Sequence, residues 1–185
     1  SHDGQKVFVP HTVVGDRVRV QRSGKPGASG AGGETIRAKL LEVIEPGPGR
    51  QIPPCPYYGE CGGCSLQHLT PAAEQDWKRE LVLQALARRG LQDVQVMPTR
   101  MMPTDSRRRT RWTATRAGGQ LLLGYQQKGT NRVIDITSCA VLDPRLNAII
   151  GPVRVLAGSL KIPKKGLGIS AILTDSGVDL TIEAP

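Results

Sequence analysis

The chain has 185 residues and a formal net charge of +9, and its apolar content of 38% permits a core that is mainly aliphatic, because only 3% of the residues are aromatic. That length suits one large domain or two small ones. No run approaches the ~18 consecutive apolar residues of a membrane-spanning helix, and the N-terminus lacks the basic-then-apolar pattern of a secretory signal. These features exclude membrane and secreted classes, and a cytoplasmic protein with no membrane partner is expected.

The first fifty residues are predicted to form a small β-barrel. Polar and apolar residues alternate over 6–9 and 16–20, which is the period of half-buried strands, and a third, less regular strand is predicted over 35–44. The Gly-rich stretch 23–33 is predicted to be the tip of a hairpin. Several short strands separated by Gly-rich turns in so short a segment favour a barrel.

A stiff segment rich in proline and glycine, residues 46–54, follows the predicted barrel. Such a segment is typical of a linker between folded parts. We therefore predict two domains, 1–53 and 54–185.

The clearest predicted helix covers residues 70–90. Thr70 suits the N-cap and Pro71 the first helical position, while Gly90 suits the left-handed position after the last turn. Apolar residues at helical spacing form one stripe, which indicates a buried face. The stripe consists of Trp77, Leu81, Val82, Ala85 and Leu86.

The second half is predicted to be an antiparallel sheet with a helix. Gly118-Gly119 suits the two-residue turn of a β-hairpin, and Asp143-Pro144 suits the start of a helix. The predicted strands are 109–117, 120–126, 131–136, 167–173 and 178–183, and the predicted helix ends near Gly158. The chain is therefore predicted to be α+β with two main helices.

Positive charge is concentrated in one window. Residues 100–138 contain eight Lys or Arg against two acidic residues, which is six of the nine net charges. A concentrated basic patch is the electrostatic pattern expected for a nucleic-acid partner. Guanidinium groups pair with phosphates and stack on unpaired bases. The candidate RNA-binding residues are Arg107, Arg108, Arg109, Arg111, Lys128 and Arg132.

The four cysteines, Cys55, Cys61, Cys64 and Cys139, admit three interpretations. Disulfides are disfavoured in the reducing compartment expected for this chain. A structural zinc site usually uses two close pairs, whereas only Cys61 and Cys64 form one here. Three local thiolates and one distant thiolate are a common ligand pattern for an iron–sulfur cluster, and neighbouring glycines would let the backbone wrap closely around it.

The motif Cys55-Pro-Tyr-Tyr-Gly-Glu-Cys61-Gly-Gly-Cys64-Ser-Leu-Gln-His68-Leu resembles the cluster motif of the RumA/TrmA-type RNA (uracil-5)-methyltransferases. The similarity continues through the Arg-rich strand, Leu121-Leu-Leu-Gly-Tyr125, Val133-Ile-Asp-Ile136 and Cys139, and then Pro144-Arg-Leu-Asn147. It covers nearly the whole chain.

This resemblance implies an order of parts. Residues 1–53 resemble a TRAM domain, an OB-like RNA-binding barrel that is incomplete here because its first strand is missing. Residues 54–185 resemble the central domain, with the four cysteines as ligands of a [4Fe–4S] cluster. In the family, a methyltransferase domain that binds S-adenosylmethionine follows, and it supplies the catalytic cysteine.

The chain departs from that pattern in two respects. No catalytic residue and no S-adenosylmethionine site are recognised in it, so we expect an N-terminal fragment that is inactive alone. Ser106 also stands where the family often has Tyr. The helix 70–90 is expected to dock on the missing methyltransferase domain as an intramolecular partner, which would leave part of its apolar stripe exposed here.

Three functions are consistent with the sequence. The chain is interpreted first as the RNA-binding, cluster-bearing portion of a methyltransferase acting on ribosomal RNA. The alternatives are a standalone zinc-bound RNA-binding module and a ferredoxin-like redox protein. The last is disfavoured because ferredoxins are usually acidic and compact.

Overall fold

A computed structural model describes residues 6–23 and 35–184. Contacts divide the chain into two units: Ser1–Pro53 with Leu66–Arg100, and Pro54–Ser65 with Met101–Pro185. Each unit is described by itself. The two domains predicted from the sequence stay a prediction, and the segment that carries three of the cysteines belongs to the second contact unit.

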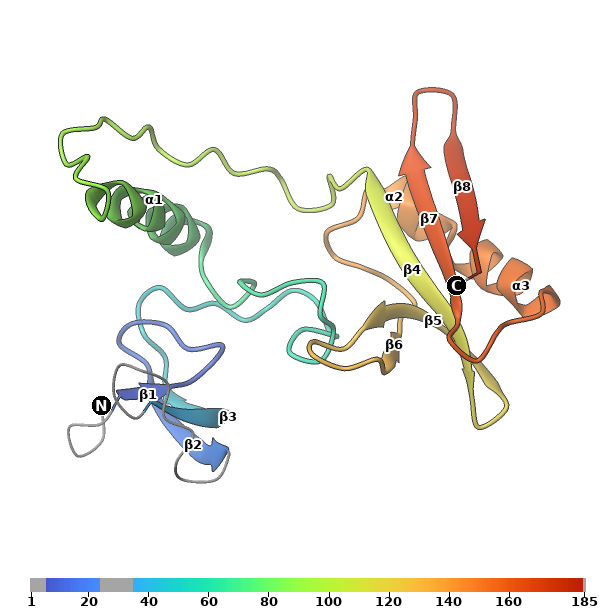
Figure 1. Cartoon of the computed structure of the whole chain (residues 1–185), viewed down its shortest axis with the longest axis horizontal. Coiled ribbons are helices and arrows are strands. Elements are labelled where there is room, and N and C mark those ends of the chain that lie inside the picture. Colours follow the sequence, from blue (N-terminus) through green and yellow to red (C-terminus); the bar gives the residue numbers. More distant parts are fainter. Residues whose placement is uncertain (1–5, 24–34, 185) are drawn as a thin grey trace. The chain divides into compact units, whose positions relative to one another are not determined.

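The first unit contains a three-stranded sheet in the order β1-β3-β2. β2 and β3 pair in antiparallel fashion, whereas β1 and β3 are parallel (Figure 1). The three predicted strands are confirmed, and β2 runs further than expected. The OB-like barrel stays a prediction, and all but the first residue of the predicted hairpin tip lies outside the described residues. The strands are β1 (Lys6–Phe8), β2 (Arg17–Ser23) and β3 (Thr35–Glu45).

A buried ion pair joins two loops of the first unit. Arg50 Nε donates to Asp16 Oδ1 at 2.8 Å, and the side chains are only 13% and 1% exposed. The amides of Val13 and Gly47 also donate to the Asp16 carboxylate. The hydrogen bond from Arg50 is the main cause that holds the pKa of Asp16 well below its ordinary value.

His68 follows the cysteine motif in sequence and belongs to the first unit. It is buried, its ring meets that of His11 edge-on, and its carbonyl accepts from the amide of Gln51. Burial lowers the pKa of His68 and favours the neutral imidazole. These contacts give His68 a structural role in the first unit.

Helix α1 (Pro71–Ala87) begins as predicted, with Thr70 Oγ1 accepting from the Ala73 amide. Gly90 has a φ of +78°, the left-handed conformation expected after the helix. No residue of α1 is buried, and Trp77 is 45% exposed. The expectation that its apolar stripe forms core is therefore wrong, and the stripe is largely accessible.

The second unit is built on a five-stranded antiparallel sheet in the order β6-β5-β4-β7-β8. Gly118 and Gly119 both have positive φ, as the tight turn between β4 and β5 requires. All five predicted strands are confirmed, although β6 is shorter than expected. They are β4 (Arg109–Ala117), β5 (Gln120–Gln126), β6 (Val133–Asp135), β7 (Leu167–Leu173) and β8 (Val178–Glu183).

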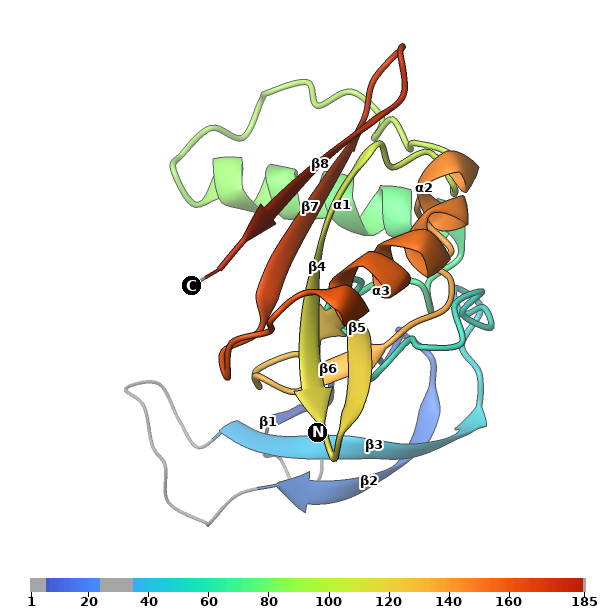
Figure 2. The same cartoon turned by 90° about the vertical axis from the view of Figure 1, so that its right-hand side faces the viewer.

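The single helix predicted after Asp143 is two helices, α2 (Pro144–Ala148) and α3 (Ile150–Ser159). Asp143 caps the first by accepting from the Arg145 amide at 3.0 Å. Pro152 has no N–H for the carbonyl of Ala148, which interrupts the helical hydrogen bonds where α2 ends. Both helices lie on one face of the sheet (Figure 2).

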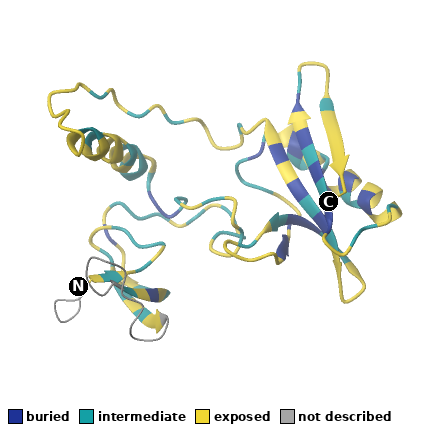
Figure 3. Cartoon of the chain, in the orientation of Figure 1, coloured by how far each residue is buried: buried dark blue, intermediate teal, exposed yellow. Residues whose placement is uncertain are grey.

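The hydrophobic core of the second unit lies between this face and the two helices. Burial alternates along β4 and β7, which is the period of strands covered on one side only (Figure 3). Trp112, Leu123 and Ile169 are fully buried from the sheet side, and Leu146 from α2. The opposite face of the sheet is open and carries the arginines.

The α+β class predicted from the sequence is confirmed, with three helices and two sheets in the described ranges. None of these helices has both the length and the apolar character needed to cross a membrane.

We predict that Asp16→Ala destabilises the first unit by about 3–5 kcal/mol, because it leaves Arg50 buried without its counter-charge. Urea unfolding of the 185-residue chain measures the loss. Glu45→Ala is the control, since the Arg17–Glu45 pair is exposed on both sides and should contribute less than about 1 kcal/mol.

The Asp16 contribution also depends on pH in a defined direction. Because the folded-state pKa is depressed, the stabilisation is present above about pH 4 and is lost as the pH falls through the folded-state pKa. The stability gap between the native chain and Asp16→Ala should narrow in acid. A gap that is unchanged in acid would contradict this assignment.

Candidate cysteine site and basic surface

The first three cysteines lie on one tightly hydrogen-bonded loop of the second unit. The Cys55 carbonyl accepts from the amide of Tyr58 at 3.1 Å, and the Tyr57 carbonyl accepts from the amide of Cys61 at 2.9 Å. Gly59 has a φ of +93° and allows the sharp reversal between them. The loop therefore folds back so that Cys55 and Cys61 are brought together.

Gly62 brings this loop into direct contact with the end of β5. Its amide donates to the Gln126 carbonyl at 3.0 Å, and Cys61 forms a β-bridge with Gln127. A Cβ at position 62 would lie 2.7 Å from the Gln126 carbonyl oxygen, so no other residue fits without a backbone shift. Glycine at position 62 therefore allows the cysteine loop to approach the end of β5 closely.

Cys139 is held by a clamp from helix α2. Its amide donates to Asn147 Oδ1 at 2.8 Å, and Asn147 Nδ2 donates to its carbonyl at 2.9 Å. Asn147 also donates to the Leu142 carbonyl at 3.3 Å. The backbone of Cys139 is therefore fixed on both sides of its side chain.

Tyr57 joins the cysteine loop to the Cys139 segment. Its hydroxyl accepts from the amide of Thr137 at 3.0 Å and lies 3.0 Å from Thr137 Oγ1. Tyr57 stands two residues after Cys55, and Thr137 two residues before Cys139. This contact holds together two segments that are far apart in the sequence.

The four thiols occupy one neighbourhood. Burial raises the pKa of the Cys61 thiol, and the nearby thiols of Cys64, Cys139 and Cys55 raise it further. The Gly63 amide opposes this by donating to Cys61 Sγ at 3.4 Å. All four cysteines are half-buried.

A single metal ion and an iron–sulfur cluster require different spacings of their ligands. Within the described ranges, no three His, Cys, Asp or Glu side chains are placed to hold one ion. A cuboidal cluster holds its four cysteine sulfurs farther apart than a tetrahedral zinc ion does, because its four iron atoms stand between them. Cysteines that lie too far apart to hold one ion can therefore still have the spacing that a cluster requires.

A group of polar side chains from β4 and β5 lies beside Cys139. Thr110 Oγ1 and the Tyr125 hydroxyl are 2.6 Å apart. Burial raises the pKa of Tyr125, the hydrogen bond with Thr110 opposes that rise, and the nearby Cys139 adds to it. Trp112 Nε1 is the one buried side-chain polar atom in the described chain with no hydrogen bond, and it lies near the same hydroxyl.

Three of the candidate arginines lie together in one hollow, and the other candidates lie elsewhere on the second unit. Arg107, Arg108 and Arg109 line a shallow hollow with Ile172 at the start of β4. Arg108 donates to the Leu173 carbonyl and pairs loosely with the exposed Asp175. In the described residues, Arg107 and Arg109 have no ion pair, so their charges are available to a ligand.

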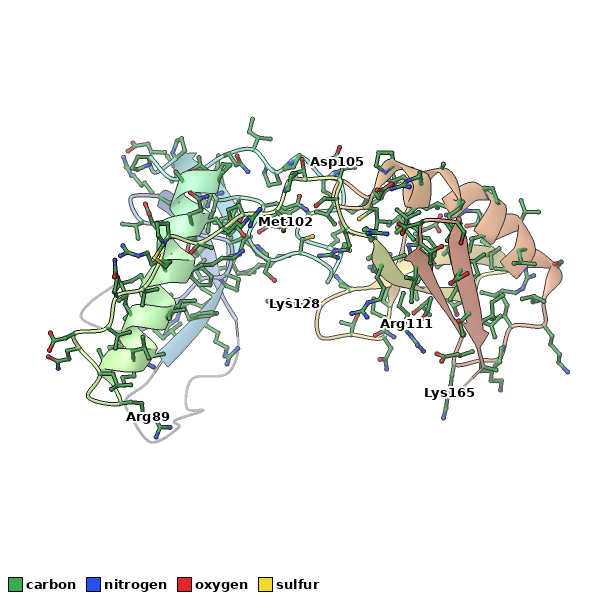
Figure 4. All side chains as sticks on the ribbon, turned by 90° about the horizontal axis from the view of Figure 1, so that it is seen from above. Arg89, Met102, Asp105, Arg111, Lys128 and Lys165 are labelled. Atoms are coloured by element: carbon green, nitrogen blue, oxygen red, sulfur yellow. The ribbon has the colours of Figure 1, made fainter. Side chains whose placement is uncertain are left out.

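Arg111 lies on the open face of the sheet, as the strand alternation predicts. It forms an exposed ion pair with Glu183 on β8. A Cβ at Gly168 would lie 2.6 Å from the guanidinium, which therefore rests over that glycine. Arg111 lines a hollow with Lys165, which the sequence did not single out. Both residues are labelled in Figure 4.

Lys128 and Arg132 lie on the turn between β5 and β6. The Gln127 amide donates to the Arg132 carbonyl at 2.8 Å and closes this turn. Lys128 shares a shallow hollow with Gly62 of the cysteine loop, and Arg132 lines another with Tyr57. These two cations therefore lie beside the cysteine site, apart from the arginines at the start of β4.

The sequence offered no separate signal for the residues that build this site. Tyr57, Thr137, Asn147 and Tyr125 act through side-chain hydrogen bonds to partners 8 to 80 positions away. Tyr57, Tyr125 and Asn147 lie within the strings that carry the family resemblance, which was the one clue available.

No protein-family model matches the chain. An uncharacterized RNA methyltransferase of Brucella suis biovar 1 (strain 1330) is 37% identical over 179 residues, which are 96% of this chain and 40% of that protein. The 23S rRNA (uracil(1939)-C(5))-methyltransferase RlmD of Shewanella amazonensis is 38% identical over 165 residues, 86% of this chain and 36% of that protein.

The enzyme of the same name from Halomonas elongata is 33% identical over 97% of this chain. The chain belongs to the RNA (uracil-5)-methyltransferase family. The resemblance seen in the cysteine motif is thereby confirmed. The chain spans about two-fifths of the length of these relatives.

We predict that Asn147→Ala lowers the free energy of unfolding of the second unit by about 1–3 kcal/mol, because it leaves the amide of Cys139 without a partner and its carbonyl with only the Leu142 amide as donor. Amide hydrogen exchange at residues 139–142 should accelerate. Arg145→Ala, an exposed neighbour on α2, is the control and should leave that exchange unchanged. Equal amide protection at residues 139–142 in the two variants would contradict the role of Asn147 in holding Cys139.

Proposed function

We propose that this chain is the RNA-binding, [4Fe–4S]-bearing portion of an S-adenosylmethionine-dependent RNA (uracil-5)-methyltransferase that acts on ribosomal RNA in the cytoplasm. Relatives named for methylation of a 23S rRNA uridine support the reaction and the substrate. The methyl transfer is assigned to a domain outside these 185 residues, and the chain alone is expected to be inactive. The first unit is proposed to be a TRAM-type RNA-binding barrel.

The observation that carries the proposal is the convergence of the thiols of Cys55, Cys64 and Cys139 on Cys61. Four thiolates are the donor set of a [4Fe–4S] cluster. The amide of Gly63 donates to Cys61 Sγ, and hydrogen bonds of this kind stabilise the negative charge of thiolate ligands. The residues present therefore fit the group.

Each residue of the site then has a defined task. Cys55, Cys61, Cys64 and Cys139 would hold the cluster, whose bonds would link the cysteine loop to the Cys139 segment and add binding free energy to the fold. Tyr57 and Asn147 position the two segments through their hydrogen bonds. The family's methyl transfer moves no electron, so the cluster is assigned a structural role or a role in RNA binding.

The RNA-binding role rests on cations of the second unit. Arg107 and Arg109 are exposed and have no ion pair in the described chain, while Arg108 and Arg111 have exposed partners that a phosphate can replace. Lys128 and Arg132 would extend the contact toward the cysteine loop. Because guanidinium groups suit both phosphates and unstacked bases, we assign a single-stranded RNA segment to this surface.

The cluster is tested by anaerobic purification of the 185-residue chain. We expect brown protein with iron and acid-labile sulfide in equal amounts, and Cys139→Ser should lose most of both. Ser65→Ala, a substitution beside Cys64 that removes no thiol, is the control. Stoichiometric zinc without iron would overturn the cluster and would favour the zinc-bound RNA-binding module.

RNA binding is tested by the salt dependence of affinity for a uridine-containing single strand of 23S rRNA. Arg107→Ala with Arg109→Ala should weaken binding and reduce the slope of log K against log salt by about 1.4, since each phosphate contact on a single strand contributes about 0.7. Lys161→Ala with Lys164→Ala removes the same charge from another exposed place. An equal loss of RNA affinity in both double variants would show that only net charge matters, and would contradict a specific role for Arg107 and Arg109.

A further inference from the structure

A hollow with a volume of about 610 Å³ opens on the face of the sheet that the helices leave uncovered. The strands β4, β7 and β8 run side by side beneath it, because Gly168 pairs with Thr113 on one side and with Glu183 on the other. Pockets that bind small ligands have volumes of about 300–1,000 Å³. The hollow is therefore large enough for a ligand the size of one nucleotide. Its lining residues include Arg111, Thr113, Gln126, Lys165, Gly168 and Glu183.

The missing side chain of Gly168 keeps this hollow open. Gly168 is not among the glycines with a positive φ, so its backbone conformation does not require glycine. A Cβ at this position would lie 2.6 Å from Nη2 of Arg111, whose guanidinium occupies the space above the glycine. The absence of a side chain at Gly168 thus allows the Arg111 charge to lie within the hollow.

Lys165 reaches the same hollow from the turn before β7. The Gly166 amide donates to the Pro163 carbonyl at 2.9 Å and closes this turn. A Cβ at Gly166 would lie 2.9 Å from the Ala114 carbonyl oxygen, so the turn rests directly on β4. Lys165 is exposed and forms no ion pair with any residue of the described chain. Its charge is therefore held beside the sheet and is available to a ligand.

The charges of the hollow favour an anion. Arg111 and Lys165 outnumber the single carboxylate among the lining residues, that of Glu183. The ion pair between Arg111 and Glu183 is more than half exposed on both sides, and exposed pairs contribute little to stability. A phosphate can therefore replace Glu183 as the partner of the guanidinium, which binds phosphate oxygens well. Lys165 supplies the second positive charge.

Two uncharged side chains offer contacts that a phosphate alone does not use. Thr113 has a hydroxyl and Gln126 a carboxamide, and each group both donates and accepts hydrogen bonds. Base edges and ribose hydroxyls of an unpaired nucleotide present the matching donors and acceptors. A hydroxyl and an amide beside two cations are therefore suited to a nucleotide.

We propose that this hollow binds one unpaired nucleotide of an RNA strand, with its phosphate on Arg111 and Lys165 and its base or ribose toward Thr113 and Gln126. The inference deepens the proposed function, on which it rests, by assigning one nucleotide to one place on the sheet. It also adds Lys165, Thr113 and Gln126 to the residues that contact RNA.

The test replaces Gly168 with alanine, which changes no charge. The added Cβ displaces the Arg111 guanidinium, so the affinity of the 185-residue chain for a single-stranded uridine oligonucleotide should fall about tenfold in Gly168→Ala. Lys165→Ala should weaken binding to a similar extent. It should also lower the slope of log K against log salt by about 0.7, the contribution of one phosphate contact on a single strand.

Two control variants match these substitutions. Gly151→Ala adds a Cβ that would have no neighbouring atom within 4 Å. Lys164→Ala removes the same charge as Lys165→Ala from the adjacent exposed position. Both controls should bind the oligonucleotide as the native chain does.

Competition at constant ionic strength identifies the ligand of the hollow. Uridine 5′-monophosphate should displace the oligonucleotide from the native chain at lower concentrations than either uridine or inorganic phosphate. Displacement by inorganic phosphate at the same concentrations would overturn the assignment of a nucleotide.

The outcomes separate this inference from the proposed function. A native chain that binds no RNA would overturn the proposed function itself. Native binding that is unchanged in Gly168→Ala and Lys165→Ala, or in Lys165→Ala where the glycine variant does not fold, would overturn this inference alone. Equal losses in Lys164→Ala and Lys165→Ala would have the same consequence.

Discussion

The cysteine site depends on the hydrogen bonds that tie the Cys55–Cys64 loop to the Cys139 segment. Cys64 and Cys139 are separated by 74 residues, and closing so long a loop opposes folding through lost chain entropy. Tyr57 bonded to Thr137 and Asn147 bonded to Cys139 offset that loss locally. The last part of the intervening chain is the antiparallel run β4-β5-β6, and the residue after β5, Gln127, bridges back to Cys61. The sheet thus brings the two segments within reach, and the side chains fix them.

The same sheet separates two chemical environments. Its covered face contains Trp112 and the aliphatic core, while its open face carries Arg109 and Arg111. Strand alternation alone produces this division, because neighbouring residues point to opposite sides. The polar group around Tyr125 lies on the covered side, next to Cys139, where water competes little for its hydrogen bonds. The cysteine site and a basic surface can therefore share one short strand pair without sharing side chains.

Sequence patterns predicted the elements well because those patterns are local. Thr70 with Pro71 and Gly118 with Gly119 each act within a few residues, and both predictions were confirmed. The break near Ile149 was missed although Pro152 is visible in the sequence, because the apolar period continues through it. Exposure of part of the α1 stripe was expected only from the family resemblance, since the stripe pattern by itself does not say what covers the helix. For the same reason Tyr57, Asn147 and Tyr125 became meaningful only once their distant partners were known.

Helix α1 gains little stability from burial, because none of its 17 residues is buried. A helix of that length is only marginally stable in water when tertiary packing contributes little. The contacts that support it are the Thr70 cap, the ion pair between Glu74 and Lys78, and the tertiary hydrogen bond from Thr99 to the Gln75 carbonyl. Its coil and helical forms therefore differ little in free energy. A surface that covers the accessible tryptophan and leucine side chains would favour the helical form over the coil. Helix formation and binding by this segment are therefore thermodynamically coupled.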